Sequence, residues 1–308
     1  TGAGGSLSQA GSQSYLVDIS TVKNRARTMA PMAAAFSAGA LCGPAIGGFI
    51  GESYGLAAPF YFVGGAIFCV TLNNFLMLPE TKPPQPEEGE KPKSLRDEFG
   101  DTLALWKPLL KDKNIRGILS VYTSYWMLSV GCVFTLMPLL ACDRFGMEPA
   151  MIGTMYALNS LINIVGSQPI AWVSDKYGRK NVILPGALII GLGAMGLVMA
   201  PSIEYFVAAS VLWGIGSCTL SGAPMAYASD VTSDKMRTQA LALLRSGGDL
   251  GFVLGGALSG SISMLLGMNA AFTVSTAMFL SAVRYFHKHG VDPLTIPETR
   301  EKQRGGES

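Results

Sequence analysis

Two charged residues, Arg245 and Asp249, lie within a long apolar segment of this sequence, residues 240–266. They are four residues apart, so on a helix they share one face and can form an ion pair. Asp249 is about ten residues into the segment, which places it about 15 Å along the helix axis. A carboxyl group held there could exchange a proton or contact a solute. The alternatives are a structural pair that neutralises itself, or an arginine that extends to the end of the segment.

A second set of polar side chains is uncharged and lies in other apolar segments. Pairs of amides recur at a spacing of four, which puts both members of a pair on one helix face, and aromatic residues cluster in one segment. The set comprises Gln9, Gln13, Tyr122, Tyr125, Trp126, Asn159, Asn163 and Gln168. These side chains predict the lining of a mixed polar and aromatic cavity. The alternative is hydrogen bonding between helices, worth less than about 1 kcal/mol for each bond.

A short charged connection, Asp175-Lys176-Tyr177-Gly178-Arg179-Lys180, separates two apolar segments. An Asp near a helix N-terminus is stabilised by the helix dipole. Arg179 can pair with a carboxylate on a neighbouring helix, so the connection could act as a latch between helices. The alternative is that its basic residues only set the orientation of the chain in a membrane.

Small residues recur every four positions in residues 39–48, so they share one helix face. Glycine at such positions lets two helix backbones approach closely, and proline removes one helical hydrogen bond. The residues of this motif are Gly39, Gly43, Pro44, Gly47 and Gly48. A matching face is formed by Gly247, Gly251, Gly255 and Ser259. We expect two such faces to pack closely, either as a seal or as an ordinary contact.

The composition is that of a membrane protein. Hydrophobic residues make up 49% of the chain and charged residues 14%, against roughly a quarter in average globular proteins. The net charge of +2 argues against nucleic acid as a partner. The five Cys and two His show no metal-ligand spacing, and the sequence contains no nucleotide-binding loop or nucleophile–base pair. We therefore expect no cofactor and no enzymatic activity.

The apolar segments are long enough to cross a bilayer, which takes about 20 residues per helix. We expect full spans at residues 30–51, 57–78, 117–141, 150–173, 181–200, 203–228, 240–266 and 268–286, and the end of another at 2–19. If the chain crosses at every span, all Lys and Arg except Arg144 and Arg245 fall in connections on one side. Basic residues collect on the cytoplasmic side, which predicts a cytoplasmic C-terminus. The sequence does not indicate which membrane is crossed.

The chain contains an internal repeat at an offset of 212 residues. The offset aligns Tyr15 with Tyr227, Asp18 with Asp230, Arg25 with Arg237, Gly39 with Gly251, Gly43 with Gly255 and Gly55 with Gly267. The copies have the same orientation, as in transporters built from parallel repeats. By this offset, we expect roughly 100 residues and three-odd further spans to precede Thr1.

The repeat also predicts the domains. Residues 1–78 are the remainder of an N-terminal helical half, and residues 117–288 are a complete six-helix half. Residues 79–116 are a cytoplasmic linker, with an amphipathic helix at 94–107 that follows a Pro- and Glu-rich stretch. Residues 289–308 are expected to be a disordered cytoplasmic tail.

Several of these motifs resemble those of the major facilitator superfamily, in particular its drug:proton antiporters. Residues 175–180 resemble its D-x-x-G-R-[RK] cytoplasmic loop, and residues 39–48 resemble its G-x-x-x-G-P-x-x-G-G antiporter motif. Asp18 with Arg25 resembles the acidic end of helix four and the basic loop after it. Pro79-Glu80-Thr81-Lys82 and Pro297-Glu298-Thr299-Arg300 resemble the tags after helices six and twelve.

The resemblance implies an all-α membrane protein, a helical bundle of two parallel six-helix repeats without its first three helices. It implies a monomeric secondary transporter in a lipid bilayer, with a small-molecule substrate and protons as partners and no nucleic acid. In the cytoplasmic loop it makes Asp230 the partner of Arg179, with Arg237 following in the next loop. It also implies that the antiporter-motif helix packs against helix eleven and seals the external side. The alternatives are a sugar or organic anion symporter or uniporter, and a non-transporting membrane sensor or inactive fragment.

Overall fold

The structure is a computed structural model that describes residues 11, 12, 15, 16, 19, 25–77, 95–233 and 235–292. Within these residues the regular structure is entirely helical, as predicted. The chain divides into two compact units. The first comprises Thr1–Lys93 and Pro149–Ala157, and the second comprises Ser94–Glu148 and Leu158–Ser308.

Two long helices form most of the described part of the first unit. Helix α2 (Arg25–Tyr54) and helix α3 (Ala58–Met77) are separated by Gly55, whose φ of +91° is a conformation that L side chains rarely adopt. All of α3 is apolar enough to cross a bilayer, and none of its side chains is buried within the chain. Such a helix needs lipid or another helix around it.

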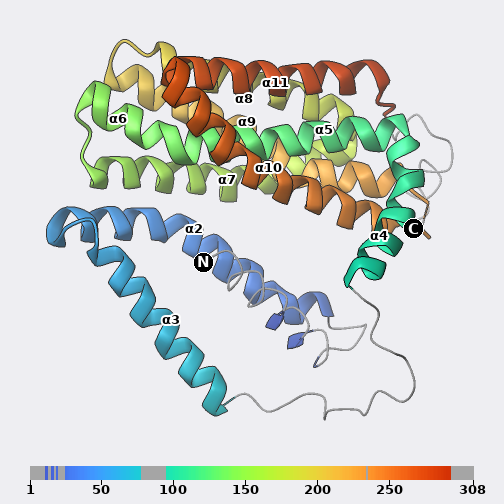
Figure 1. The fold of residues 1–308 in the computed structure, drawn as a ribbon, viewed down its shortest axis with the longest axis horizontal. Coiled ribbons are helices and arrows are strands. Elements are labelled where there is room, and N and C mark those ends of the chain that lie inside the picture. Colours follow the sequence, from blue (N-terminus) through green and yellow to red (C-terminus); the bar gives the residue numbers. More distant parts are fainter. Residues whose placement is uncertain are drawn as a thin grey trace. The chain divides into compact units, whose positions relative to one another are not determined.

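The second unit is a bundle in which α5 and α8–α11 lie side by side (Figure 1). Its elements are α4 (Leu95–Lys111), α5 (Lys113–Leu128), the π-helical segment η1 (Ser129–Leu136), α6 (Met137–Phe145), α7 (Pro149–Tyr177) from Leu158 onward, α8 (Arg179–Met199), α9 (Ile203–Asp230), α10 (Arg237–Leu266) and α11 (Met268–His289). The core is aromatic and aliphatic, with Phe206, Tyr227, Phe272, Phe279 and Phe286 fully buried.

Local sequence explains where these helices begin and end. The Asp112 carboxylate accepts a hydrogen bond from the Asn114 backbone N–H at 2.8 Å and caps α5. Pro149 opens α7, where its missing N–H has no cost. Left-handed Gly146 ends α6, and Gly178, at a φ of +99°, separates α7 from α8.

Each of the eight predicted full spans coincides with a helix, and five helical stretches meet a length and apolarity criterion for crossing a membrane. Helices α2, α7 and α11 are also long, with 30, 29 and 22 residues. The span predicted at 117–141 is part of a longer continuous helix, Lys113–Phe145, that includes η1. The amphipathic helix predicted at 94–107 coincides with α4. Most of the partial span, the Pro-rich stretch and the tail beyond Asp292 lie outside the described residues.

The internal repeat is present in the structure. Helices α2 and α10 each have 30 residues, and both of their ends align at the offset of 212. Gly55 and Gly267 follow these helices with φ values of +91° and +88°. The two sequence copies therefore form the same helix–glycine–helix unit.

Candidate functional site: a charged helix connection and the cavity beside it

The connection between α7 and α8 carries a cluster of charges. Arg179 forms an ion pair with Asp175 in the last turn of α7, and its Nε lies 3.1 Å from Oδ2 of Asp230 at the end of α9. The Arg179 side chain is only 18% exposed and that of Asp230 28%, so bulk water screens this pair only in part. One guanidinium thus joins the ends of two helices, and the Arg179–Asp230 pair is the one that the sequence predicted.

Lys180 binds the end of another helix. Its Nζ donates hydrogen bonds to the carbonyl oxygens of His287, at 2.9 Å, and Gly290, at 2.6 Å. Carbonyl groups at a helix C-terminus lack helical partners and carry partial negative charge, so a lysine there is stabilising. The same connection therefore holds α8 against the end of α11, a contact that the sequence did not reveal.

Glycine at position 178 is required by its surroundings as well as by its φ. A Cβ added there would overlap the carboxylate of Asp292. The segment that contains Asp292 is also bound to α5 and α9. The Asn114 Oδ1 accepts a hydrogen bond from the Val291 N–H at 2.8 Å, and the Tyr227 hydroxyl donates to the Val291 carbonyl at 2.8 Å. The sequence did not indicate these partners, because they lie far apart in the chain and their residue types suggest no contact between them.

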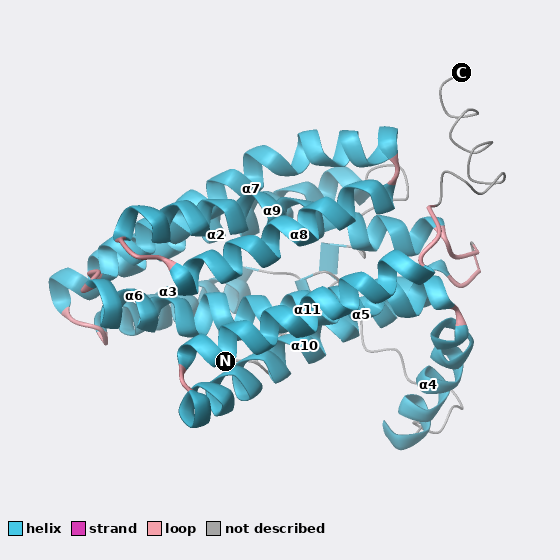
Figure 2. Cartoon of the chain, turned by 90° about the horizontal axis from the view of Figure 1, so that it is seen from above, coloured by secondary structure: helices cyan, strands magenta, loops and turns pink. Residues whose placement is uncertain are grey.

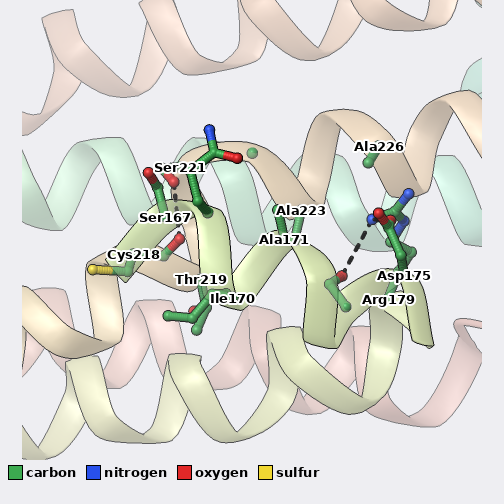
Figure 3. Close-up of a pocket in the computed structure, with 13 residues that line it drawn as sticks. Ser167, Ile170, Ala171, Asp175, Arg179, Cys218, Thr219, Ser221, Ala223 and Ala226 are labelled. Atoms are coloured by element: carbon green, nitrogen blue, oxygen red, sulfur yellow. Dashed lines mark hydrogen bonds and ion pairs between the residues drawn. The ribbon is translucent and has the colours of Figure 1, made fainter. Parts of the chain in front are cut away.

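A cavity of about 350 Å³ lies between α7 and α9, with the charged cluster at one end (Figure 3). Asp175 and Arg179 line that end, whereas Ser167 and Ser221 lie at the other end in the close-up. Its remaining lining comes from Gln168, Ile170, Ala171, Ser174, Cys218, Thr219, Gly222, Ala223 and Ala226. Small and hydroxyl-bearing side chains leave this space open. Of the predicted cavity residues, Gln168 lies here.

The two predicted asparagines of α7 contact α9 instead. Asn159 is 7% exposed, and its Nδ2 donates to Ser210 Oγ at 2.6 Å. Asn163 Nδ2 donates to Ser217 Oγ at 3.3 Å. Both asparagines make the interhelical hydrogen bonds that were the alternative, and Asn159 is enclosed between helices. Their placement in a cavity lining stays a prediction.

The aromatic cluster predicted on the first span of the second half is present. The ring centroids of Tyr125 and Trp126 are 5.7 Å apart and those of Tyr122 and Trp126 are 6.3 Å apart, both edge to face. Tyr122 and Tyr125 are buried. Gly248 of α10 lies against this cluster, because a Cβ there would meet the Tyr122 ring at 2.7 Å. The cluster therefore packs α5 onto α10.

Arg245 and Asp249 are on α10 on either side of Gly248, and both are exposed. No ion pair joins them among the residues that the structure describes, so the alternative of a pair that neutralises itself is not seen in this structure. Two separate exposed charges on a helix apolar enough to span a membrane need water or a polar partner around them.

The small-residue face of α10 packs against α5. In α10, Gly251 and Gly255 lie against the backbone of Thr123 and Met127 on α5, and Ser259 is buried beside Gly131. That face is therefore occupied within the second unit, and the predicted contact between the antiporter-motif helix and helix eleven stays a prediction.

The antiporter-motif helix has a different close neighbour. Within the first unit, a Cβ added at Gly48 would lie 2.6 Å from the carbonyl oxygen of Pro149, and one added at Gly153 would overlap the carbonyl of Pro44. The motif thus lies against the first turns of α7. Among the described residues, an added Cβ at Gly39, Gly43 or Gly47 meets no atom within 4 Å.

The remaining predicted site residues are not tested by contacts. Gln9, Gln13 and Asp18 lie outside the described residues, and the side chain of Arg25 does too, although Arg25 begins α2. Arg237 begins α10, at the position that the repeat offset assigns to it.

Comparison with known proteins agrees with the fold. The family model described as Major Facilitator Superfamily matches residues 1–163 and, again, residues 127–307. The chain belongs to the Major Facilitator Superfamily. It is an integral, multi-pass membrane protein, and the resemblance seen in its motifs is confirmed. The family and the relatives named below are transporters and not enzymes.

Two curated relatives illustrate the range of this superfamily. The chain is 26% identical over 159 residues to Multidrug resistance protein 2 of Bacillus subtilis (strain 168), which covers 50% of the chain and 38% of that protein. It is 22% identical over 255 residues to the uncharacterized MFS-type transporter MJ1560 of Methanocaldococcus jannaschii, covering 83% of the chain and 64% of that protein. The chain thus spans less than two thirds of either relative.

A solved structure shows the same fold. The human organic anion transporter MFSD10 (TETRAN) superimposes with a TM-score of 0.61 at 22% identity, over 89% of the chain and 66% of that protein. The likeness confirms the predicted superfamily-type helical bundle.

Proposed function

We propose that this protein works as a secondary transporter that moves a small solute across a membrane by alternating access. The observation that carries the proposal is the charged connection between α7 and α8. It joins the ends of α7, α8, α9 and α11 through Arg179 and Lys180 at one edge of the bundle. Charge pairs of this kind, partly buried, are stable enough to hold a state and weak enough to be exchanged when helices move.

The charge asymmetry of the connections supports a cytoplasmic position for this edge and for the C-terminus. The cluster would then hold the cytoplasmic ends of the second half together while the substrate site is open to the other side. Its release would accompany opening to the cytoplasm. Such a transport cycle requires a structural element that can adopt two alternative arrangements.

For the transported solute we propose a drug or metabolite exchanged for protons. The antiporter-like motif at residues 39–48 and the similarity to Multidrug resistance protein 2 support this choice. Asp249 is the residue that we propose as the site of proton exchange, because it is an exposed carboxyl group on an apolar helix and no described cation pairs with it. Arg245 precedes Gly248 on the same helix, and the Tyr122–Trp126 cluster of α5 packs against Gly248. Both would border the solute.

The proposal is tested by reconstituting the protein in proteoliposomes and measuring counterflow of labelled cationic drugs, sugars and organic anions. Saturable transport of a drug, driven by an imposed proton gradient and opposite in direction to the protons, supports antiport. Transport of a sugar or organic anion in the same direction as protons would support a symporter instead. Absence of counterflow for every class would favour a sensor without transport.

The role of Asp249 has its own test. In Asp249→Asn, a pH-driven antiporter loses proton-dependent uptake but keeps energy-independent exchange, because exchange needs no change of protonation. Ser246→Ala, a change one turn away without a charge, is the control and keeps both activities. Proton-driven uptake at the wild-type rate in Asp249→Asn would exclude this residue as the coupling site and leave transport itself intact.

A further inference from the structure

Helices α8 and α11 are neighbours that contact each other at two levels (Figure 2). At one level Lys180 holds the His287 carbonyl, and at the other a Cβ added at Gly191 would lie 3.0 Å from the Leu280 side chain. The two helices therefore run in opposite directions. Between these levels they leave a cavity of about 490 Å³, which is within the size range of roughly 300–1,000 Å³ seen for small-molecule sites.

The lining of this cavity is divided into an apolar part and a basic end. Leu184, Pro185, Leu188, Leu280 and Val283 form the apolar part. Arg284 and His287 form the basic end, and no acidic residue lines the cavity. This division is unlike that of the cavity between α7 and α9, which has hydroxyl and amide side chains among its apolar ones and carries Asp175.

Arg284 is a charged side chain without a protein partner in the described part of the chain. It is exposed, and its side chain makes neither an ion pair nor a hydrogen bond with another described residue. Lys180 contacts the His287 carbonyl, and Lys288 follows Arg284 closely in the chain. Both lysines add to the positive charge at this end of the cavity. A cation beside an apolar groove on a membrane-spanning bundle is complementary to a ligand with an anionic head and a hydrocarbon chain.

We propose that the groove between α8 and α11 binds an anionic phospholipid of the cytoplasmic leaflet. The phosphate lies against Arg284 and His287, and one acyl chain lies along Leu184, Leu188 and Leu280. The choice of leaflet rests on the proposed orientation of the chain, in which Arg284 is at the cytoplasmic edge. A lipid held there would contact the same turn of α11 that Lys180 binds, and so would support the α8–α11 contact.

The headgroup contact is tested by native mass spectrometry of the detergent-purified protein, titrated with phosphatidylglycerol or with phosphatidylcholine of the same chains. The wild-type protein retains the anionic lipid preferentially. Arg284→Gln lowers its retention about fivefold, which corresponds to the loss of about one basic residue at an anionic surface. Lys288→Gln removes the same charge from an exposed position outside the lining and has less than about half that effect. Equal losses in the two variants, or equal retention of both lipids by the wild type, would overturn the proposal.

The chain contact is tested with a matched pair of tryptophan variants on α8. Leu188, which lines the cavity, is 55% exposed and Leu192, one turn along and outside the lining, is 64% exposed. Leu188→Trp fills the groove and lowers lipid retention with every charge in place, whereas Leu192→Trp retains lipid as the wild type does. Undiminished retention in Leu188→Trp would show that the lipid is held elsewhere. Because these measurements need no transport, their outcome is independent of the proposed transport function.

Discussion

Helices α2 and α10 are copies of one sequence pattern with aligned ends, yet their small-residue faces have different surroundings. In α10, Gly251 and Gly255 lie against the backbone of α5. The aligned Gly39 and Gly43 of α2 have no atom of a described residue within 4 Å of an added Cβ. The comparison teaches that a small-residue face specifies a helix that can be approached closely, but not which helix approaches it.

The largest expected difference is at the aligned glycines themselves. In Gly251→Leu the side chain would overlap the backbone carbonyl of Thr123, which cannot rotate away. We expect a loss of about 1–3 kcal/mol or more in the free energy of unfolding, as for other overpacked sites. Gly39→Leu should lose less than about 0.5 kcal/mol, as at open sites. Thermal unfolding of the purified protein measures both.

A control for that experiment lies on α10 itself. An added Cβ at Gly256, the residue next to Gly255, meets nothing within 4 Å. Gly256→Leu should therefore unfold at the wild-type temperature. If Gly256→Leu or Gly39→Leu is as destabilising as Gly251→Leu, the two copies do not differ in the way the structure shows.

A smaller effect should be equal in the two copies. Gly55 and Gly267 both have a φ near +90°, where an L side chain is strained. Neither has an atom within 4 Å of an added Cβ, so only backbone strain would change. Alanine at either position should cost about 1–2 kcal/mol. Unequal losses in thermal unfolding would mean that the copies do not share this turn.

The smallest expected effect concerns α11, the copy of α3. Lys180→Gln removes a cation from the α11 C-terminus and should cost about 0.3–1 kcal/mol. The change should appear as faster amide hydrogen exchange in the last turn of α11, around Phe286 to Gly290. Lys235→Gln, at an exposed position in another connection, is the control. Unchanged exchange in Lys180→Gln would show that the lysine contributes nothing to the end of α11.

Much of the fold was predictable from the sequence because it depends on the length of the apolar runs and on the residues that end them. Long apolar runs bounded by glycine, proline and charge predicted the spans, and the repeat offset predicted matching ends for α2 and α10. The Arg179–Asp230 pair was predictable from the motif. These features are local or repeat a known pattern.

The missed features depend on the rotation of helices about their axes. Periodicity showed that Asn159 and Asn163 share a face, but not that this face meets the serines of α9. The spacing of Arg245 and Asp249 allowed an ion pair that the side chains do not form. The π-helical segment η1 and the role of Asn114 at the end of α11 gave no local signal, because both arise from contacts between distant segments.

The central claim is that the Arg179–Asp230 pair controls a transport cycle, and a charge swap tests it most directly. Counterflow should be measured in proteoliposomes for Arg179→Asp, Asp230→Arg and the double variant. The account predicts that each single variant loses most of its transport, because two like charges then replace the ion pair whose Nε and Oδ2 atoms are 3.1 Å apart. The double variant should recover much of it. Transport at the wild-type rate in both single variants, with equal amounts of folded protein, would contradict the account.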